Sequence, residues 1–169
     1  MIFVTLGSQK FQFNRLLIEI DRLVDEGKMN EEVFAQIGYS DYKPKSYRYK
    51  EFLDRDEFNN LMDKCNTVLT HGGTGAIIGA VKKEKRVIAV PRLAKFGEHV
   101  DDHQIQIVSE FKDLSFIEAI YDISDLKNAL NEIENKKFER YISNTDILIK
   151  DIEEFITNQT NQKEKRWTR

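Results

Sequence analysis

The chain has 169 residues, and 26 lysines and arginines against 29 aspartates and glutamates give it a net charge of −3. This length fits one domain, and the acidic balance disfavours a nucleic-acid-binding protein, which neutralises phosphates with a basic surface. Its one cysteine, Cys65, excludes an internal disulfide and speaks against secretion. No apolar run approaches the ~20 residues that span a bilayer, and the N-terminus has no signal-peptide pattern, so we expect a cytosolic single-domain protein.

Predicted strands and helices alternate along the chain. Short runs rich in β-branched residues predict strands over 1–6, 33–38, 67–70, 86–90 and 114–117, and residues 39–50 predict a loop around a short strand. Apolar residues at helical spacing predict helices over 13–24, 58–65, 76–81, 100–112 and 124–135, the last with Ser124 as its N-cap. A final helix is predicted to place on one face Ile142, Ile149, Ile152 and Ile156. This alternation predicts an α/β fold: a single Rossmann-like domain whose parallel sheet is flanked by helices.

The end of the chain differs in composition from the rest. We expect the domain to cover residues 1–157, followed by a polar, basic tail over 158–169. The tail, which carries Trp167, is expected to be a solvated end, with contact to an anionic membrane or to a partner as the alternative. Cys65 continues the apolar spacing of the helix 58–65, which predicts an inert thiol on a buried face.

The segment His71-Gly72-Gly73-Thr74-Gly75, called the glycine loop below, lies between a predicted strand and a predicted helix. Glycines there let the backbone approach a ligand closely, and the free N–H groups of a helix start bind anions. The Thr74 hydroxyl can add a further donor. Since the loop has more glycines than a tight turn needs, it predicts a phosphate site in preference to a turn that binds nothing.

Two common phosphate ligands do not fit this loop. A P-loop needs Gly-Lys-Ser/Thr, but Gly75 is followed by Ala76, which excludes nucleotide hydrolysis by that route. A dinucleotide site needs an acidic residue at the end of the next strand, and that strand ends in Pro91 and Arg92. NAD is therefore disfavoured.

A polar run, residues 98–104, follows the strand 86–90 and is expected on the same rim of the sheet as the glycine loop. Its carboxylate, amide and imidazole groups suit a hydroxylated ligand such as a sugar, and a solvated loop at a helix start is the alternative. His99 and His103 have the i, i+4 spacing of zinc ligands on a helix. Val100, however, stands where the zincin pattern has glutamate, so no metal site is predicted.

Taken together, these motifs resemble the donor-binding half of GT-B glycosyltransferases, the C-terminal domain of glycosyltransferase family 28. The resemblance rests on Thr70 with the glycine loop, on Pro91-Arg92, and on Glu98-His99-Val100-Asp101-Asp102-His103-Gln104. Segments 3–9 and 36–40 narrow it to PssE-type subunits of bacterial exopolysaccharide and capsule galactosyltransferases. Their eukaryotic relative is the cytosolic subunit of the split enzyme that adds the second N-acetylglucosamine to dolichol diphosphate. The resemblance covers residues 1–155.

The resemblance implies a site for a nucleotide sugar, most often a UDP-sugar. The residues that would cradle the donor diphosphate are His71, Gly72, Gly73, Thr74 and Gly75, with Gly7 and Ser8 from the turn after the first strand. Those that would meet the sugar hydroxyls are Asp102 and Gln104, with His103 and Glu98 of the same run as further candidates. Relatives carry a ribose-binding glutamate four residues past the loop, where this chain has Gly79, so the ribose contact is not assigned.

The resemblance also implies half of an enzyme, because a GT-B transferase has two Rossmann-like domains and this chain has the length of one. A membrane-anchored partner subunit is expected to bind the lipid-linked saccharide acceptor, to supply the catalytic base and to hold this chain at the inner face of the plasma membrane. The expected reaction is the transfer of a hexose from a UDP-sugar donor in exopolysaccharide or capsule synthesis, and galactose is the expected hexose. No cofactor and no metal are expected, so EDTA should leave activity intact. The alternatives are a non-catalytic stabilising subunit and a free-standing nucleotide-binding protein.

Overall fold

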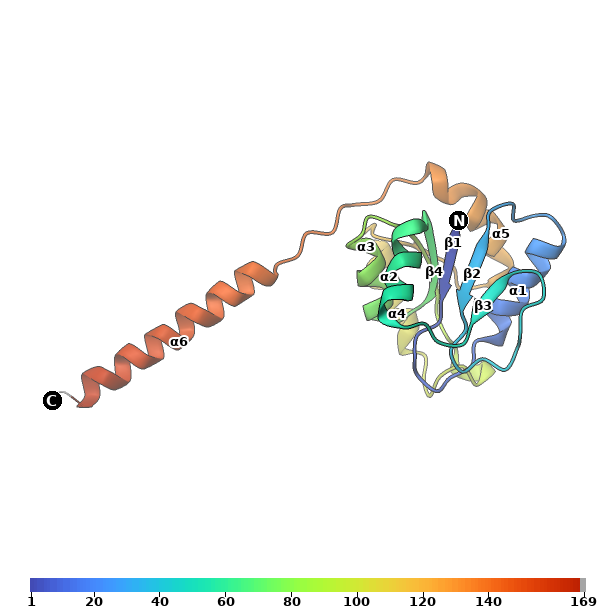
Figure 1. The fold of residues 1–169 in the computed structure, drawn as a ribbon. Coiled ribbons are helices and arrows are strands. Elements are labelled where there is room, and N and C mark those ends of the chain that lie inside the picture. Colours follow the sequence, from blue (N-terminus) through green and yellow to red (C-terminus); the bar gives the residue numbers. More distant parts are fainter. Residues whose placement is uncertain (168–169) are drawn as a thin grey trace.

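Six parallel strands form one sheet in the computed structural model, which describes residues 1–167 and their side chains as far as residue 157 (Figure 1). The strand order is β3-β2-β1-β4-β5-β6. The strands are β1 (Ile2–Thr5), β2 (Val33–Gln36), β3 (Arg48–Lys50), β4 (Thr67–His71), β5 (Arg86–Val90) and β6 (Glu118–Ala119). The chain order reverses between β1 and β4, which are paired with Val4 opposite Leu69. A crevice forms at such a reversal, outside the carboxyl ends of the strands.

Helices cover both faces of the sheet (Figure 1). One face packs against α1 (Asn14–Asp25) and α5 (Leu126–Glu132), and the other against α2 (Arg55–Lys64), α3 (Thr74–Val81) and α4 (His103–Asp113). Neighbouring strand residues serve opposite faces, as the pleat requires: Val4 belongs to the first core and Phe3 to the second. The predicted α/β domain with a parallel sheet is therefore confirmed.

Local sequence explains why the helices form where they do. Apolar residues on one stripe of α1 are all buried: Leu16, Leu17, Ile20 and Leu23. α2 begins with a capping box, in which the Asp54 carboxylate accepts a hydrogen bond of 2.8 Å from the Glu57 N–H. Cys65 directly follows α2 and is buried, and burial raises the pKa of its thiol, as expected for an inert core cysteine.

Two predicted elements are wrong in their details. Residues 114–117 do not form a strand, because Ser115 takes a left-handed conformation (φ 58°) and the Phe116 N–H bonds back to the Phe111 carbonyl, which ends α4 as a helix terminus. The strand follows instead, as β6. Ser124 is not an N-cap, because the Asp122 carboxylate accepts from its N–H at 3.0 Å. The predicted helix 124–135 is broken accordingly into the short 3-10 helices Ile123–Asp125 and Ile133–Asn135 around α5.

The last helix, α6 (Thr145–Trp167), extends away from the sheet (Figure 1). Ile142 precedes it, so the prediction that this residue belongs to the helix is wrong. All side chains described between 142 and 157 are exposed. α6 also continues through residue 157, where the basic tail was expected to begin, while the tail's side chains, including that of Trp167, lie outside the described residues. Within the described part of the chain, no helix has the length and apolarity needed to cross a membrane.

Candidate functional site

A cavity of about 490 Å³ lies at the carboxyl ends of β1 and β4. Its volume is within the ~300–1,000 Å³ that is typical of ligand pockets. Three segments meet there: the turn after β1, the glycine loop and the polar run. The lining residues are Gly7, Ser8, Gln9, His71, Gly72, Gly73, Thr74, Gly75, Ala76, His99, His103, Gln104 and Ile107. The fold thus brings together segments that are about 30 and 60 residues apart in sequence.

The glycine loop presents free backbone donors to this cavity. α3 begins at Thr74 with Gly73 as N-cap, and no side chain caps it. The N–H groups of Ala76 and Ile77 both bond to the Gly73 carbonyl at 3.1 Å. Within residues 1–167, those of Gly73, Thr74 and Gly75 have no hydrogen-bond partner. Adjacent free donors at the positive end of a helix form a site for an anion.

His71 explains two of the nearby glycines. A Cβ atom on Gly73 would lie 2.3 Å from Nε2 of the His71 ring, and one on Gly7 would lie 2.8 Å from its Cε1. Gly7 also has a φ of +73°, which side chains rarely adopt. Burial and, to a smaller extent, the charge of Arg92 lower the pKa of His71 to about 4. At neutral pH, His71 is therefore an uncharged ring that supports both turns.

Gln104 holds the glycine loop from the other side. Its Oε1 accepts hydrogen bonds from the N–H groups of Gly72 and Arg92, both at 3.0 Å. Only the amide oxygen can accept, so these two donors fix the orientation of the amide. A Cβ on Gly72 would lie 2.7 Å from that of Gln104, so this glycine too is required by packing. Among the described residues Nε2 has no partner, which leaves an amide donor for a ligand.

Gly75 differs from the other glycines of the cavity. A Cβ there meets nothing within 4 Å, although the residue lines the cavity. Packing inside the protein therefore does not explain a glycine at this position, and the space above it is open to a ligand. Because neighbouring side chains require Gly72 and Gly73, the glycine content of the loop reflects internal packing as well as a site.

Two of the residues predicted to bind sugar lie outside the cavity lining. Glu98 is fully buried, and its carboxylate accepts hydrogen bonds of 3.0 Å from Nε and Nη2 of Arg15. Asp102 accepts from the Ala94 N–H at 2.7 Å. Both carboxylates hold the loop that leads into α4, whereas the two residues after Asp102 do line the cavity.

Arg92 is a buried cation to which the sequence assigns no role in the site, although this residue disfavours NAD and forms part of the family resemblance. Its side chain is 1% exposed, and Nη2 donates to the Leu6 carbonyl at 2.8 Å. Nε and Nη1 have no hydrogen-bond partner in the described part of the chain. Burial lowers the pKa of Arg92 more than the charge of Glu98 raises it; the resulting pKa of about 10 keeps the guanidinium charged at neutral pH. Its charge lies behind the site that the glycine loop forms and favours an anion there.

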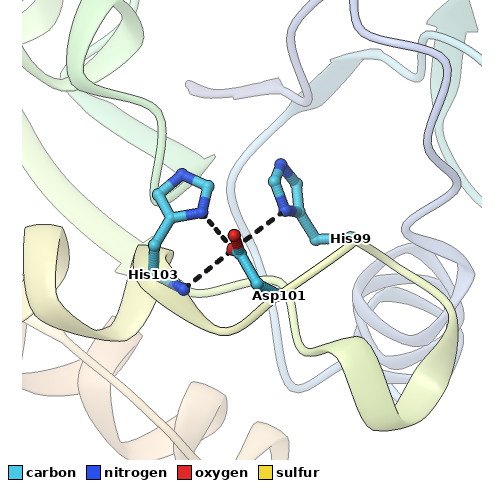
Figure 2. A group of neighbouring side chains, drawn as sticks. All are labelled: His99, Asp101 and His103. Carbon is cyan, nitrogen blue, oxygen red and sulfur yellow. Dashed lines mark hydrogen bonds and ion pairs between the residues drawn. The ribbon is translucent and has the colours of Figure 1, made fainter.

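Asp101 is a second residue whose role sequence reasoning missed. It lies between His99 and His103, and both imidazole rings turn a nitrogen toward its carboxylate (Figure 2). The hydrogen bond with His103 lowers the pKa of Asp101. The His-x-Asp-x-His spacing is present in the sequence, but the zinc-ligand pattern concerns only the two histidines.

Gly79 lies on α3 outside the cavity lining, so it offers no ribose contact.

The described cavity lining contains no carboxylate, lysine or arginine. It can bind a phosphate group through backbone donors, a helix end and neutral side chains. It offers no carboxylate general base. The site is therefore suited to holding an anionic ligand.

Comparisons with known proteins agree with this geometry. Residues 1–156 match the family described as "Glycosyltransferase family 28 C-terminal domain". The UDP-N-acetylglucosamine transferase subunit ALG13 of Candida albicans is 26% identical over 98 residues, which are 58% of this chain and 32% of that protein. The chain thus spans about a third of the length of this curated relative.

Solved structures show the fold. The glycotransferase of kitacinnamycin has a TM-score of 0.60 at 15% identity, over 80% of this chain and 35% of that one. The solution structure of ALG13 has a TM-score of 0.55 at 16% identity, over 84% and 89%. SnogD from Streptomyces nogalater has a TM-score of 0.50 at 17% identity, over 79% and 38%. The α/β domain thus corresponds to about a third of the kitacinnamycin glycotransferase and SnogD structures and to most of the ALG13 structure.

Proposed function

The chain belongs to the glycosyltransferase family 28 C-terminal domains, and we propose that it is the donor-binding subunit of a two-component glycosyltransferase. The observation that carries this proposal is the cavity at the β1–β4 crevice, which has three free backbone donors and no carboxylate among its described lining residues. Such a site can bind the donor but lacks a carboxylate base. A partner subunit would supply the base and bind the acceptor.

The proposed donor is a UDP-hexose. The N–H groups of Gly73, Thr74 and Gly75 would hold the diphosphate and stabilise the charge that develops on the leaving UDP. The free Nε2 of Gln104 would donate to a sugar hydroxyl, with His103 beside it. The ribose contact is left unassigned, since Gly79 provides none. Galactose is our first candidate for the sugar, from the resemblance to PssE-type subunits, and N-acetylglucosamine, which the name of the fungal relative contains, is the second.

We assign the partner contact to α6. Its exposed apolar side chains Leu148, Ile149, Ile152 and Phe155 fall on one stripe at helical spacing, with charged residues opposite. A helix of this kind binds into an apolar groove of another protein. The proposed partner is the membrane-anchored, acceptor-binding subunit, which would bring this chain to the inner face of the plasma membrane for transfer to a lipid-linked saccharide in exopolysaccharide or capsule synthesis.

Calorimetric titration of the chain with UDP, UDP-galactose and UDP-N-acetylglucosamine tests the donor site. Gly75→Val should lower UDP affinity at least ~10-fold, because its side chain enters the space left for the ligand. Gly79→Val is the matched control, because it lies on the same helix with equally open space but outside the cavity. Its UDP affinity should be that of the unmodified chain.

Three results would contradict the proposal. Equal effects of Gly75→Val and Gly79→Val would move nucleotide binding away from the glycine loop. Absence of UDP binding, both by the chain and by its complex with the acceptor-binding subunit, would favour a non-catalytic stabilising subunit instead. A chain that binds UDP but forms no such complex would be a free-standing nucleotide-binding protein.

A further inference from the structure

Three potential metal ligands converge at the mouth of the cavity. They are His99, Asp101 and His103, whose donor atoms lie within 4.8 Å of one another (Figure 2). We propose that these residues bind a divalent first-row transition cation, and that the cation joins the glycine loop in holding the donor diphosphate. The second part of this inference rests on the proposed function, whereas the first part does not.

The spacing of the donor atoms suits a tetrahedral cation. His99 Nδ1 lies 3.4 Å from Oδ1 of Asp101, and two ligand atoms on a tetrahedral zinc lie about 3.4 Å apart. His103 Nδ1 is hydrogen-bonded to the same carboxylate oxygen, and the Asp101 carboxylate also accepts from the His103 N–H at 3.1 Å. A cation would take the place of the proton between His103 and Asp101, with small movements of the side chains.

His99 gives an independent reason to expect a ligand. Its side chain is 8% exposed, and in the described structure its Nδ1 makes no hydrogen bond, only the 3.4 Å contact with Oδ1 of Asp101. Buried polar atoms rarely lack a partner. The ring is held in place by Phe11, whose centroid is 4.6 Å away, and by the edge-on ring of His103, also at 4.6 Å. This nitrogen, which makes no hydrogen bond, is therefore fixed in position and faces the carboxylate of Asp101, as Figure 2 shows.

The chemistry of the three ligands selects the class of cation. Two imidazole nitrogens and one carboxylate suit Zn²⁺, Mn²⁺, Co²⁺ or Fe²⁺, whereas Mg²⁺ and Ca²⁺ prefer oxygen ligands. Three protein ligands leave at least one coordination position open. Because His99 and His103 both line the cavity, an open position faces the space beside the glycine loop.

Charge balance explains what the cation would do there. A diphosphate ester carries about two negative charges at neutral pH, and the described cavity lining has no lysine or arginine. Arg92 lies behind the loop and is fully buried, so it contributes charge without reaching the ligand. A cation held by His99, Asp101 and His103 supplies the missing positive charge at the cavity itself. The inference replaces the expectation, drawn from sequence, that this site works without metal.

The first experiment measures cation binding without nucleotide. The full chain, free of any histidine tag, is treated with EDTA, dialysed and titrated with Zn²⁺ in a calorimeter, and with Co²⁺ by visible absorption. We expect one equivalent to bind. Asp101→Asn and His99→Ala should each weaken binding at least ~10-fold. Asp102→Asn is the matched control: it removes the same charge one residue away and keeps an oxygen for the Ala94 N–H.

His99→Ala removes a mostly buried ring and could destabilise the fold. Asp101→Asn keeps the test decisive in that case, because residue 101 is exposed and the aspartate and asparagine side chains are of nearly equal size. No saturable binding of Zn²⁺ or Co²⁺ up to about 1 mM would overturn the proposal. Equal affinity of Asp101→Asn and the unmodified chain would overturn it as well, because the cation would then be bound elsewhere.

The second experiment repeats the UDP titration with and without saturating Zn²⁺. The cation should raise UDP affinity about 10-fold or more, and by linkage UDP should raise Zn²⁺ affinity by the same factor. The gain should be lost in Asp101→Asn and kept in Asp102→Asn. Zn²⁺ binding with no gain in UDP affinity would overturn the role at the diphosphate. Zn²⁺ binding by a chain that binds no UDP, either alone or in complex with the acceptor-binding subunit, would contradict the proposed function and leave the cation site standing.

Discussion

The glycine loop and α6 show opposite relations to the rest of the molecule. Around the loop, buried groups fix one another: Gln104 clamps two backbone N–H groups, and the His71 ring fills the space that two glycines leave. In α6, every side chain described is exposed, including apolar ones such as Ile152. The loop is thus complete within this chain, and α6 has an apolar stripe that only another molecule can bury. The difference separates what one chain does alone from what needs a partner.

Gln104 gives the largest expected effect on the loop side of this comparison. Gln104→Ala leaves two buried N–H groups, of Gly72 and Arg92, without an acceptor and should lower the free energy of unfolding by about 2–4 kcal/mol. Gln104→Glu retains an acceptor for both and should lose less than half as much. Urea unfolding of both variants measures this. Equal losses would show that the clamp is not what fixes the loop.

His71 makes the loop side sensitive to acid. Its pKa is about 4 in the folded protein, below the ordinary 6.5, so the unfolded chain takes up a proton first as the pH falls. Stability from this group is complete above pH 6.5 and is lost progressively down to pH 4. Urea unfolding should therefore give about 2 kcal/mol less at pH 5 than at pH 7.5. In His71→Gln the difference between the two pH values should shrink by about that amount.

Gly75 tests whether stability and binding are separable within the loop. Gly75→Ala adds a Cβ in open space near the start of a helix, so the free energy of unfolding should rise by about 0.5–1 kcal/mol. The same Cβ should reduce UDP affinity. Thermal unfolding with and without UDP measures both. A gain in stability with unchanged UDP affinity would remove Gly75 from the binding site.

The smallest effect is expected in α6. Ile152→Ala should change the free energy of unfolding by no more than about 0.5 kcal/mol, because its side chain is 57% exposed. The control is Ile20→Ala in α1, where a buried isoleucine should cost about 2–5 kcal/mol. A loss of similar size in both variants would mean that α6 packs against its own domain in solution.

The sheet and most helices could be predicted because their signals are local. Strand β5 coincides with a run of β-branched residues that ends before Pro91, and the bounds of α1 are close to those of the apolar stripe in the sequence. The strand predicted over 114–117 is wrong because an apolar run can also form the turn that ends a helix, where Leu114 is exposed. The left-handed conformation of Ser115 leaves no mark in the sequence. The exposure of α6 could not be predicted for a related reason. An apolar stripe predicts that a helix face is buried, but it does not identify the molecule that buries it.

The cavity could be predicted only in part. That the glycine loop, the first turn and the polar run share one rim follows from parallel topology. Which side chains of the polar run face the cavity does not, because Glu98 and Gln104 are both polar and both buried but differ in partners. The packing of His71 against Gly7 joins residues more than 60 positions apart, so no pattern along the chain reveals it.

The connection between the domain and α6 has a consequence for assembly. Residues 136–144 contain no helix or strand, and around Glu139 they lie near the start of β5, at the edge of the sheet opposite the cavity (Figure 1). Residues 136–141 are held on the domain, for example by the Glu139 N–H, which donates to the Ser115 carbonyl at 2.9 Å. Residues 142–144, which reach roughly 10 Å when extended, connect them to α6. A protein bound to α6 would thus be tethered to this domain. Its effective concentration at the cavity would be in the millimolar range, and its binding would not change the shape of the cavity. Donor affinity and assembly strength could then be tuned by separate mutations.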